Sequence, residues 1–207
     1  MVELLKAKDI TLRKLENLFG LQLAEDEKFF FEWQEELPEI TDLQKQLLDE
    51  VKAGYLNLRR ASHVLEQTVN MAVLSPLLFI GKFYLEPFEL RSEYSLEITT
   101  EDEGTKIQGN IDFLLLKEQL WLVGIESKKS YLSVEAGLDQ ILAYLMSNPV
   151  AEKPYYGMIT TGGEFVFIKL VKSDRPRYAL SDGFKIRDLG NDLYRVLRIL
   201  KHLADGV

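Results

Sequence analysis

The sequence has 207 residues, of which 46% are hydrophobic and 28% charged, enough to bury a sizeable core in one domain. Its net charge is −8, so any surface that binds phosphate must be a local one. There is no cysteine and there are only two histidines, which excludes disulfides, thiolate zinc sites and a multi-histidine metal centre within one chain. Residues 1–10 do not resemble a signal peptide, and no apolar run approaches the ~18–20 residues of a membrane span. We therefore expect a cytoplasmic protein without membrane contact.

The first residues of the chain predict a short helix and an aromatic, acidic segment. Thr11 to Phe19 reads as the helix, with Thr11 as its N-cap and Gly20 placed to end it. Asp26 to Glu36 combines four aromatic residues with five acidic ones. We expect these aromatic side chains to pack against neighbouring helices, and the alternative is a helix that binds a partner.

Two further helices are predicted before the middle of the chain. Thr41 or Asp42 caps a long helix that reaches about Arg60, with apolar residues at helical spacing. Ser62 opens another helix, which Pro76 is expected to kink or stop. Residues 1–81 are therefore expected to form a helical N-terminal extension packed on the rest of the protein.

From about Phe83 the hydrophobic period changes to that of strands. The predicted strands are Phe88–Thr99, Lys106–Leu116, Leu120–Glu126, Tyr155–Thr160, Glu164–Val171 and, more weakly, Phe184–Arg187. The expected connections are an acidic turn at residues 101–104 and tight turns at residues 117–119 and 161–163. A helix capped by Ser133 and ended by Asn148-Pro149 is predicted over residues 134–147, and a last helix over residues 191–204. Residues 82–207 are thus expected to form an α/β core.

Charged and polar side chains gather at the ends of the central strands. Asp112 heads one apolar run and Glu126 ends the next, so a hairpin between them can place the two carboxylates side by side. Lys128 shares a strand face with Glu126. Gln140 and Tyr144 are one helical turn apart and share a face of the following helix.

Two adjacent carboxylates repel each other, so they need a shared proton or a cation between them. Mg²⁺ takes carboxylate and carbonyl oxygens, and the backbone carbonyl of Ser127 would add to the set from Asp112 and Glu126. Lys128 can place a positive charge over an attacking water or a developing phosphate charge. These groups are suited to metal-assisted hydrolysis of a phosphodiester. The alternative is that the acidic residues are ordinary caps and solvated strand edges.

The ordered set of motifs resembles the PD-(D/E)xK nuclease superfamily, and most closely the N-terminal nuclease domain of the type I restriction enzyme motor subunit. Three motifs carry the resemblance, namely Gly109-Asn110-Ile111-Asp112, Glu126-Ser127-Lys128 and Gln140-Ile141-Leu142-Ala143-Tyr144. They match the G-x-x-D, E-x-K and Q-x-x-x-Y motifs of the family. Thr160-Thr161-Gly162 resembles a later T-N-G turn, with Thr161 in place of the asparagine. The resemblance covers about residues 84–170.

The resemblance implies a restriction-endonuclease-like α/β fold, a mixed sheet flanked by helices, and an Mg²⁺- or Mn²⁺-dependent nuclease. Asp112 and Glu126 would bind the metal, with Glu66 as a further acidic candidate on an earlier helix and a salt bridge to a nearby arginine as its alternative role. Lys128 would activate or orient water. Gln140 and Tyr144 would support the site and, with Lys129, contact the nucleic acid.

DNA is the more expected substrate, with RNA as the alternative. No phosphate-loop or helicase motif follows, so any translocation would come from a separate helicase or specificity chain, and a homodimer could cut two strands. The rival function is an idle nuclease-fold module used for nucleic-acid binding or protein assembly. Residues 169–207 hold nine basic side chains against five aspartates, a net +4 that suits either a nucleic-acid backbone or a solvated helix face.

Overall fold

A mixed sheet of nine strands forms the centre of the computed structural model, which describes residues 3–61, 63–99, 105–117, 120–129, 133–147 and 153–205. The strands are β1 (Glu3–Lys6), β2 (Gln22–Leu23), β3 (Phe88–Thr99), β4 (Thr105–Lys117), β5 (Leu120–Ser127), β6 (Pro154–Thr160), β7 (Glu164–Val171), β8 (Arg177–Leu180) and β9 (Phe184–Lys185). Their order is β1-β4-β5-β6-β7-β8-β2, with β3 paired to β4 and β9 to β7. β5 and β6 run parallel, whereas the β4–β5 and β6–β7 pairs are antiparallel.

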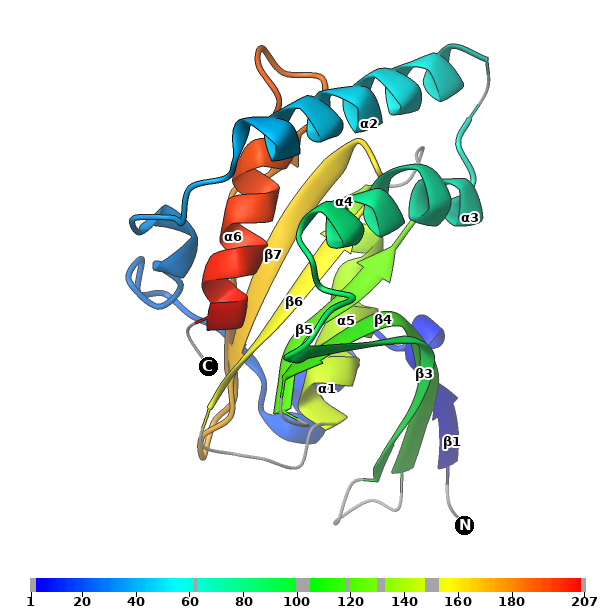
Figure 1. Cartoon of the computed structure of the whole chain (residues 1–207). Coiled ribbons are helices and arrows are strands. Elements are labelled where there is room, and N and C mark those ends of the chain that lie inside the picture. The colour runs from blue at the N-terminus through cyan, green and yellow to red at the C-terminus, as the bar shows by residue number, and fades with distance from the viewer. Residues whose placement is uncertain are drawn as a thin grey trace.

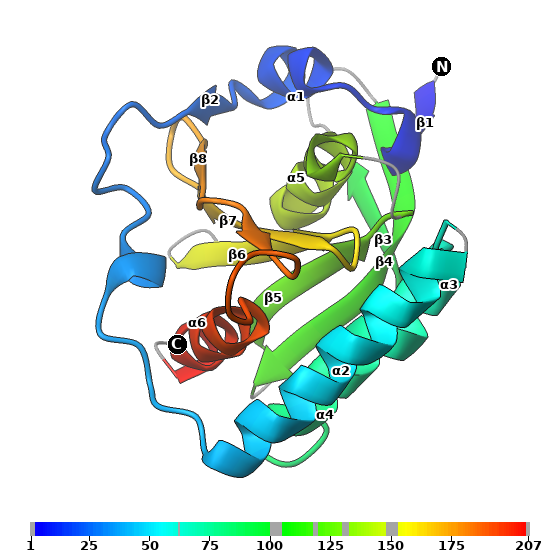
Figure 2. The ribbon, with the colours of Figure 1, turned by 90° about the horizontal axis from the view of Figure 1, so that it is seen from above.

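Helices cover both faces of this sheet. They are α1 (Leu12–Phe19), α2 (Asp42–Ala61), α3 (Glu66–Val69), α4 (Ser75–Ile80), α5 (Leu138–Ser147) and α6 (Leu193–Asp205), with 3₁₀ turns at Ala7–Asp9, Glu32–Gln34 and Val134–Gly137 and a π segment at Asn70–Leu74. Figure 1 shows the arrangement, and Figure 2 shows α1 and α5 on one face and α2, α4 and α6 on the other. The mixed α/β class predicted from the sequence is confirmed, and it is consistent with a restriction-endonuclease-like fold.

A separate hydrophobic cluster lies on each face of the sheet. Leu48, Leu77 and Leu197 bring α2, α4 and α6 together on one face. Leu15 and Ile141 bring α1 and α5 to the other. Each such side chain contributes about 1.5–3 kcal/mol when removed from water, so the sheet is fixed from both sides.

The caps expected at the first two helices are present. The side chain of Thr11 accepts a hydrogen bond from the Lys14 amide, and Gly20 ends α1 in the left-handed conformation at φ 64°. The Thr41 amide donates to Gln44 Oε1 at 3.0 Å while the Gln44 amide donates to Thr41 Oγ1 at 3.2 Å. This reciprocal pair is a capping box and fixes the start of α2.

Pro76 does not stop the helical run in which it lies. The chain passes from α3 through the π segment into α4, and the Ser75 amide donates to the carbonyl of Asn70, five residues back. The wider π turn directly before Pro76 makes room for a ring that clashes with the fourth preceding carbonyl in a regular α-helix. Ser62, where this helix was predicted to open, lies outside the described residues, but residues 63–65 are not helical and α3 begins only at Glu66, so the helix starts later than predicted.

The N-terminal segment 1–81 was predicted to be helical, and that prediction is wrong in three places. β1 pairs in parallel with β4, and β2 pairs in parallel with β8. Residues 26–36 form turns and one 3₁₀ turn, with Phe30 against Tyr156 of β6 and Trp33 against Phe184 of β9. Their aromatic side chains thus pack largely on the sheet. Too few residues of this segment have helical spacing for it to form a helix. The division at residue 81 stays a prediction.

The strands of the second half agree with the prediction, except that β8 was missed within a segment read as turns. The Thr161-Gly162-Gly163 turn joins β6 to β7, and Gly162 has a φ of 76°. Helices α5 and α6 lie where expected, although the first turn of the predicted 134–147 helix is 3₁₀. The predicted turns at residues 101–104 and 118–119, and the Asn148-Pro149 stop, lie outside the described residues.

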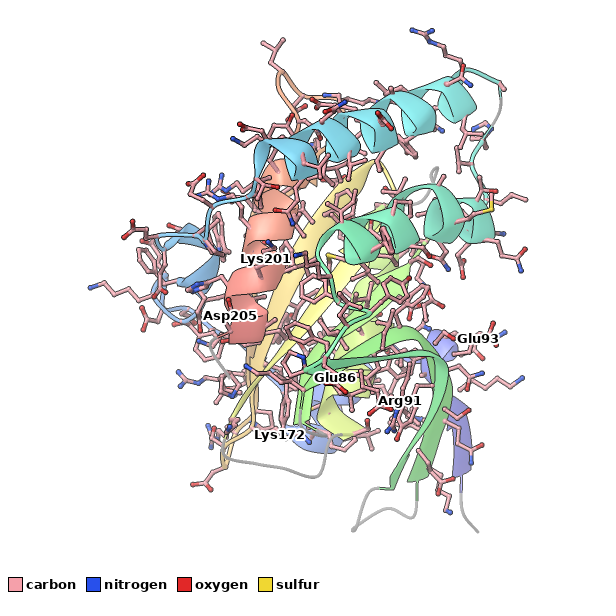
Figure 3. The ribbon with its side chains drawn as sticks, in the orientation of Figure 1. Glu86, Arg91, Glu93, Lys172, Lys201 and Asp205 are labelled. Carbon is pink, nitrogen blue, oxygen red and sulfur yellow. The ribbon has the colours of Figure 1, made fainter. Side chains whose placement is uncertain are left out.

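The basic C-terminal residues largely hold the acidic segment 26–39 in place. Arg198 donates to the carbonyls of Leu37 and Pro38 at 2.8 and 2.9 Å, His202 Nε2 lies 3.0 Å from Glu35 Oε2, and Lys169 pairs with Glu32. Figure 3 shows Lys172 just past β7, at the end of the sheet opposite the ends of β5 and β6. Several of these charges therefore stabilise the fold instead of forming one track for a phosphate backbone.

Within the described residues, no helix is long and apolar enough to cross a membrane.

Candidate active site

The two predicted carboxylates lie at neighbouring strand ends. β4 and β5 are antiparallel with Phe113 opposite Ile125, so one further step brings Asp112 opposite Glu126. The Ser127 amide donates to Asp112 Oδ2 at 2.7 Å, and the Ser127 hydroxyl donates to the same oxygen. Both bonds use Oδ2, which leaves the lone pairs of Oδ1 for another ligand.

Lys128 is held by two groups that fix the position of its ammonium. Its Nζ donates to Glu126 Oε1 at 2.6 Å and to Gln140 Oε1 at 2.9 Å. Gln140 Nε2 donates to the Tyr144 hydroxyl at 2.8 Å, and that hydroxyl donates to the Asn110 carbonyl at 2.7 Å. A chain of hydrogen bonds thus runs from β5 through α5 to β4, so the E-x-K and Q-x-x-x-Y motifs form one unit.

Helix α5 carries its half of this unit because its apolar stripe packs on the sheet. Ile141, Leu142 and Leu145 are buried, and the Gln140–Tyr144 pair lies at the flank of that stripe. Gly137, just before α5, lets the helix approach the site closely. A Cβ there would lie 3.2 Å from Lys128 Cε and 3.6 Å from Glu126 Cγ.

Gly109 allows Tyr144 to reach β4, so Gly109→Ala is expected to lower the free energy of unfolding by about 1–3 kcal/mol. An added Cβ would lie 2.7 Å from Ala7 Cβ and 2.8 Å from the Tyr144 hydroxyl oxygen. Gly54→Ala in α2 is the control, because nothing lies within 4 Å of a Cβ there. That change is expected to stabilise the protein by up to about 1 kcal/mol. Urea denaturation measures both, and equal effects of the two substitutions would contradict this role of Gly109.

Glu126 is a buried carboxyl in an unfavourable environment. It is 2% exposed, and its Oε2 has no hydrogen-bond partner among the described residues. Burial first, and then the charges of Asp112 and Glu66, raise the pKa of Glu126 to about 8, although Lys128 opposes the shift. A hard divalent cation would satisfy the orphaned oxygen and offset the repulsion from Asp112, so the residues present fit such a metal.

Without metal, this shifted pKa makes the protein less stable as the pH rises from 4.5 to 8. The unfolded chain loses the Glu126 proton near pH 4.5 while the folded protein keeps it to about pH 8, so the folded state binds more protons in that window. We expect Glu126→Gln to gain stability relative to the original protein by on the order of 1 kcal/mol per pH unit there. Urea denaturation in a chelator at pH 5 and pH 8 measures this difference. Parallel pH profiles for the two proteins would contradict the shifted pKa.

Glu66, the further acidic candidate, lies at the start of α3 near the same charges. Burial and then Asp112 raise its pKa, whereas Lys128 and Lys129 lower it. It is half-buried. Over the described ranges, no three histidine, cysteine or carboxylate side chains gather into a ready ligand set. Glu66 is therefore near the pair formed by Asp112 and Glu126, and its role as a metal ligand stays a prediction.

Some site residues occupy positions that refine the sequence prediction. Tyr144 is 2% exposed, which suits support of Gln140 and leaves no free surface for nucleic acid. Ser127 acts through its amide and hydroxyl on Asp112, whereas its carbonyl as a metal ligand stays untested. Sequence reasoning missed the Asn110 carbonyl and Gly137, because a main-chain acceptor and a missing side chain leave no residue-type signal.

Comparison with known proteins finds structural similarity but no match to a family model. No family model matches the chain, and no curated protein matches it. A solved fragment described as an HsdR subunit of a type I restriction enzyme from Vibrio vulnificus YJ016 is similar at a TM-score of 0.43 and 14% identity. The match covers 69% of this chain and 26% of that one, so the chain spans about a quarter of the fragment. The similarity is distant.

Proposed function

We propose that the protein is a divalent-metal-dependent nuclease of the PD-(D/E)xK type that hydrolyses phosphodiester bonds, with DNA as the preferred substrate. The observation that carries the proposal is the orphaned oxygen of buried Glu126, beside Asp112 and within an ion pair to Lys128. A structural carboxylate would normally have its hydrogen bonds satisfied. This one is left for a ligand at the ends of adjacent strands.

Each side chain has a distinct task in this proposal. Asp112 and Glu126 would hold Mg²⁺ or Mn²⁺, which when bound supplies a Lewis acid for a phosphoryl oxygen and a more acidic water. Ser127 orients Asp112 by its two hydrogen bonds. Lys128, fixed by Gln140, places its ammonium where negative charge develops on the scissile phosphate. Tyr144 keeps the Gln140 amide oriented so that its oxygen, and not its nitrogen, faces Lys128. Lys129, next in the chain, would contact the nucleic-acid backbone.

The test is a cleavage assay of the whole chain on single- and double-stranded DNA and RNA, with Mg²⁺, with Mn²⁺ and with chelator. We expect metal-dependent cleavage of DNA that the chelator abolishes. Cleavage that persists in chelator would contradict the metal requirement. Failure to cleave any of the four substrates with either metal would favour the idle nuclease-fold module over the enzyme.

Two features of the substrate complex follow as part of the same proposal. A second copy of the chain would be needed to cut both strands of a duplex in one event, because one chain supplies one site. Any movement along DNA would be the task of a separate helicase or specificity chain. Size-exclusion chromatography with light scattering, with and without a DNA duplex, measures the first of these.

A further inference from the structure

A small cavity lies between α2 and the turn that follows β6. Its volume is about 290 Å³, and it is lined on one side by Tyr55 and Arg59 and on the other by Thr161 and Gly163. The Tyr55 ring is buried, and a Cβ on Gly163 would lie 2.6 Å from its hydroxyl oxygen. The glycine turn thus brings main chain against the phenol, with α2 at that end of the sheet (Figure 1). We call this cavity the arginine pocket.

The charged side chains that line the arginine pocket carry a small net positive charge. Arg59, Lys185 and Arg187 line it together with Glu164 and Asp188, and Lys185 Nζ lies 3.8 Å from Glu164 Oε1. Burial raises the pKa of the Tyr55 hydroxyl, while the guanidinium charges of Arg59 and Arg187 oppose that rise. Both arginines line the same cavity as Tyr55. The net positive charge of this lining contrasts with the −8 of the whole chain.

Lys52 of α2 holds the loop that contributes Asp188 to the lining of the pocket. Its Nζ donates to the main-chain oxygens of Asp188 and Gly190. The loop that carries Arg187 is thereby tied to α2, the helix that carries Arg59. The two guanidinium groups are held by elements that are joined to each other.

The arginine pocket is next to the candidate active site in the sheet. Thr161, which lines the pocket, directly follows Thr160, the residue that pairs with Ser127. Ser127 pairs with Thr160 across β5 and β6, and the Lys128 amide donates to the Thr160 carbonyl at 2.7 Å. Neighbouring strands lie about 4.8 Å apart. If the scissile phosphate of a polynucleotide lay at Glu126, the nucleic-acid strand would run past this end of β6 on one side of the cut.

We propose that the arginine pocket binds a phosphate of the nucleic-acid backbone, beside the one that is cut. Guanidinium groups present planar pairs of N–H donors that match two phosphate oxygens, and a tyrosine hydroxyl adds a third donor. A contact to a backbone phosphate positions the strand and carries no direct sequence information. This inference rests on the proposed nuclease function and assigns a second contact to its substrate.

The test measures binding of a fluorescein-labelled 20-nucleotide DNA, single-stranded and duplex, to the whole chain in chelator, by anisotropy over a range of salt. For the double variant Arg59→Ala/Arg187→Ala we expect binding about 10- to 100-fold weaker. The salt slope should also fall by about 0.7–0.9, as expected for one lost phosphate contact. Arg60→Ala is the matched control, because Arg60 is exposed in the same turn of α2 and does not line the pocket. It should change affinity by less than about threefold.

The outcomes separate this inference from its rivals. Unchanged affinity and salt slope in the double variant, or an effect no larger than that of Arg60→Ala, would overturn it. A different outcome is that both arginines are needed to bind deoxynucleoside monophosphate but not to bind the oligonucleotide. The pocket would then be a site for free nucleotides, which also overturns the proposal. Because Arg187 is exposed, Arg187→Ala alone provides a folded variant if the double change disturbs α2, and it should show about half of the change in salt slope.

Failure of the nuclease function gives a different pattern. If the protein cuts nothing but the arginine variants still lose DNA affinity, the pocket stands and the catalytic proposal falls. If the protein cuts DNA and the arginine variants bind and cut normally, the catalytic proposal stands and the pocket falls. Comparing KM with kcat in active protein adds a further check, since a positioning phosphate contact raises KM more than it lowers kcat.

Discussion

Asp112→Asn is expected to lower the rate of metal-dependent cleavage by at least about 10³-fold, because it removes one of two anionic groups that would hold the metal. A loss of about 4 kcal/mol of transition-state stabilisation corresponds to that factor. Asparagine keeps the size of the side chain and an oxygen that can accept the two bonds from Ser127, so the local fold should survive. Single-turnover cleavage of a labelled duplex measures the effect.

A second readout distinguishes lost metal binding from lost folding. The charge of Asp112 is one cause of the raised pKa of Glu126, so Asp112→Asn should lower that pKa. Asp174→Asn, at an exposed position between β7 and β8, is the control and should leave both quantities unchanged. Wild-type cleavage by Asp112→Asn would remove Asp112 from the site, whatever its effect on stability.

Lys128→Met is expected to lower kcat by about 10²- to 10³-fold while KM changes little, because an ammonium aimed at developing charge acts mainly in the transition state. The lysine side chain is 13% exposed, so methionine of similar length should fit the space. Lys128 also lowers the pKa of Glu126, so its loss should move the pH dependence of metal binding to higher pH. Isothermal titration with Mn²⁺ at several pH values measures this shift.

The matched comparison for Lys128 is Gln140→Leu, which removes the group that fixes the ammonium without removing its charge. We expect a smaller loss of kcat, about tenfold, since Lys128 keeps its ion pair with Glu126. Equal losses for the two substitutions would mean that the position of the ammonium, and not its charge alone, governs the rate. A wild-type kcat for Lys128→Met would exclude the lysine from catalysis.

The sequence predicted those parts of the fold in which local pattern and tertiary packing agree. The capping residue Thr41 and the strand pair that carries Asp112 and Glu126 are of this kind, because periodicity and turn residues specify them locally. β1 and β2 were missed because strands of four and two residues carry little periodicity, and their existence depends on the distant partners β4 and β8. The helical reading of residues 26–36 failed because their aromatic side chains are spaced for packing on the sheet.

The site could be predicted as a set of residues but not as a network. Spacing paired Glu126 with Lys128 and Gln140 with Tyr144, and the resemblance to nuclease motifs joined the two pairs into one site. Their hydrogen bonds agree with that grouping. The two bonds from Ser127 to Asp112 depend on the register of β4 against β5, which spacing alone does not give. The arginine pocket joins residues more than 100 positions apart, so no local pattern reports it.

The most direct test of this account is the position of Mn²⁺ in crystals of the whole protein, located by anomalous scattering. We expect a peak within about 2.1–2.3 Å of carboxylate oxygens from both Asp112 and Glu126, the distance expected for hard-cation ligation. The peak should disappear in Asp112→Asn. A Mn²⁺ ion bound elsewhere, or none at saturating concentration while Glu126 keeps its orphaned oxygen, would contradict the proposed metal site.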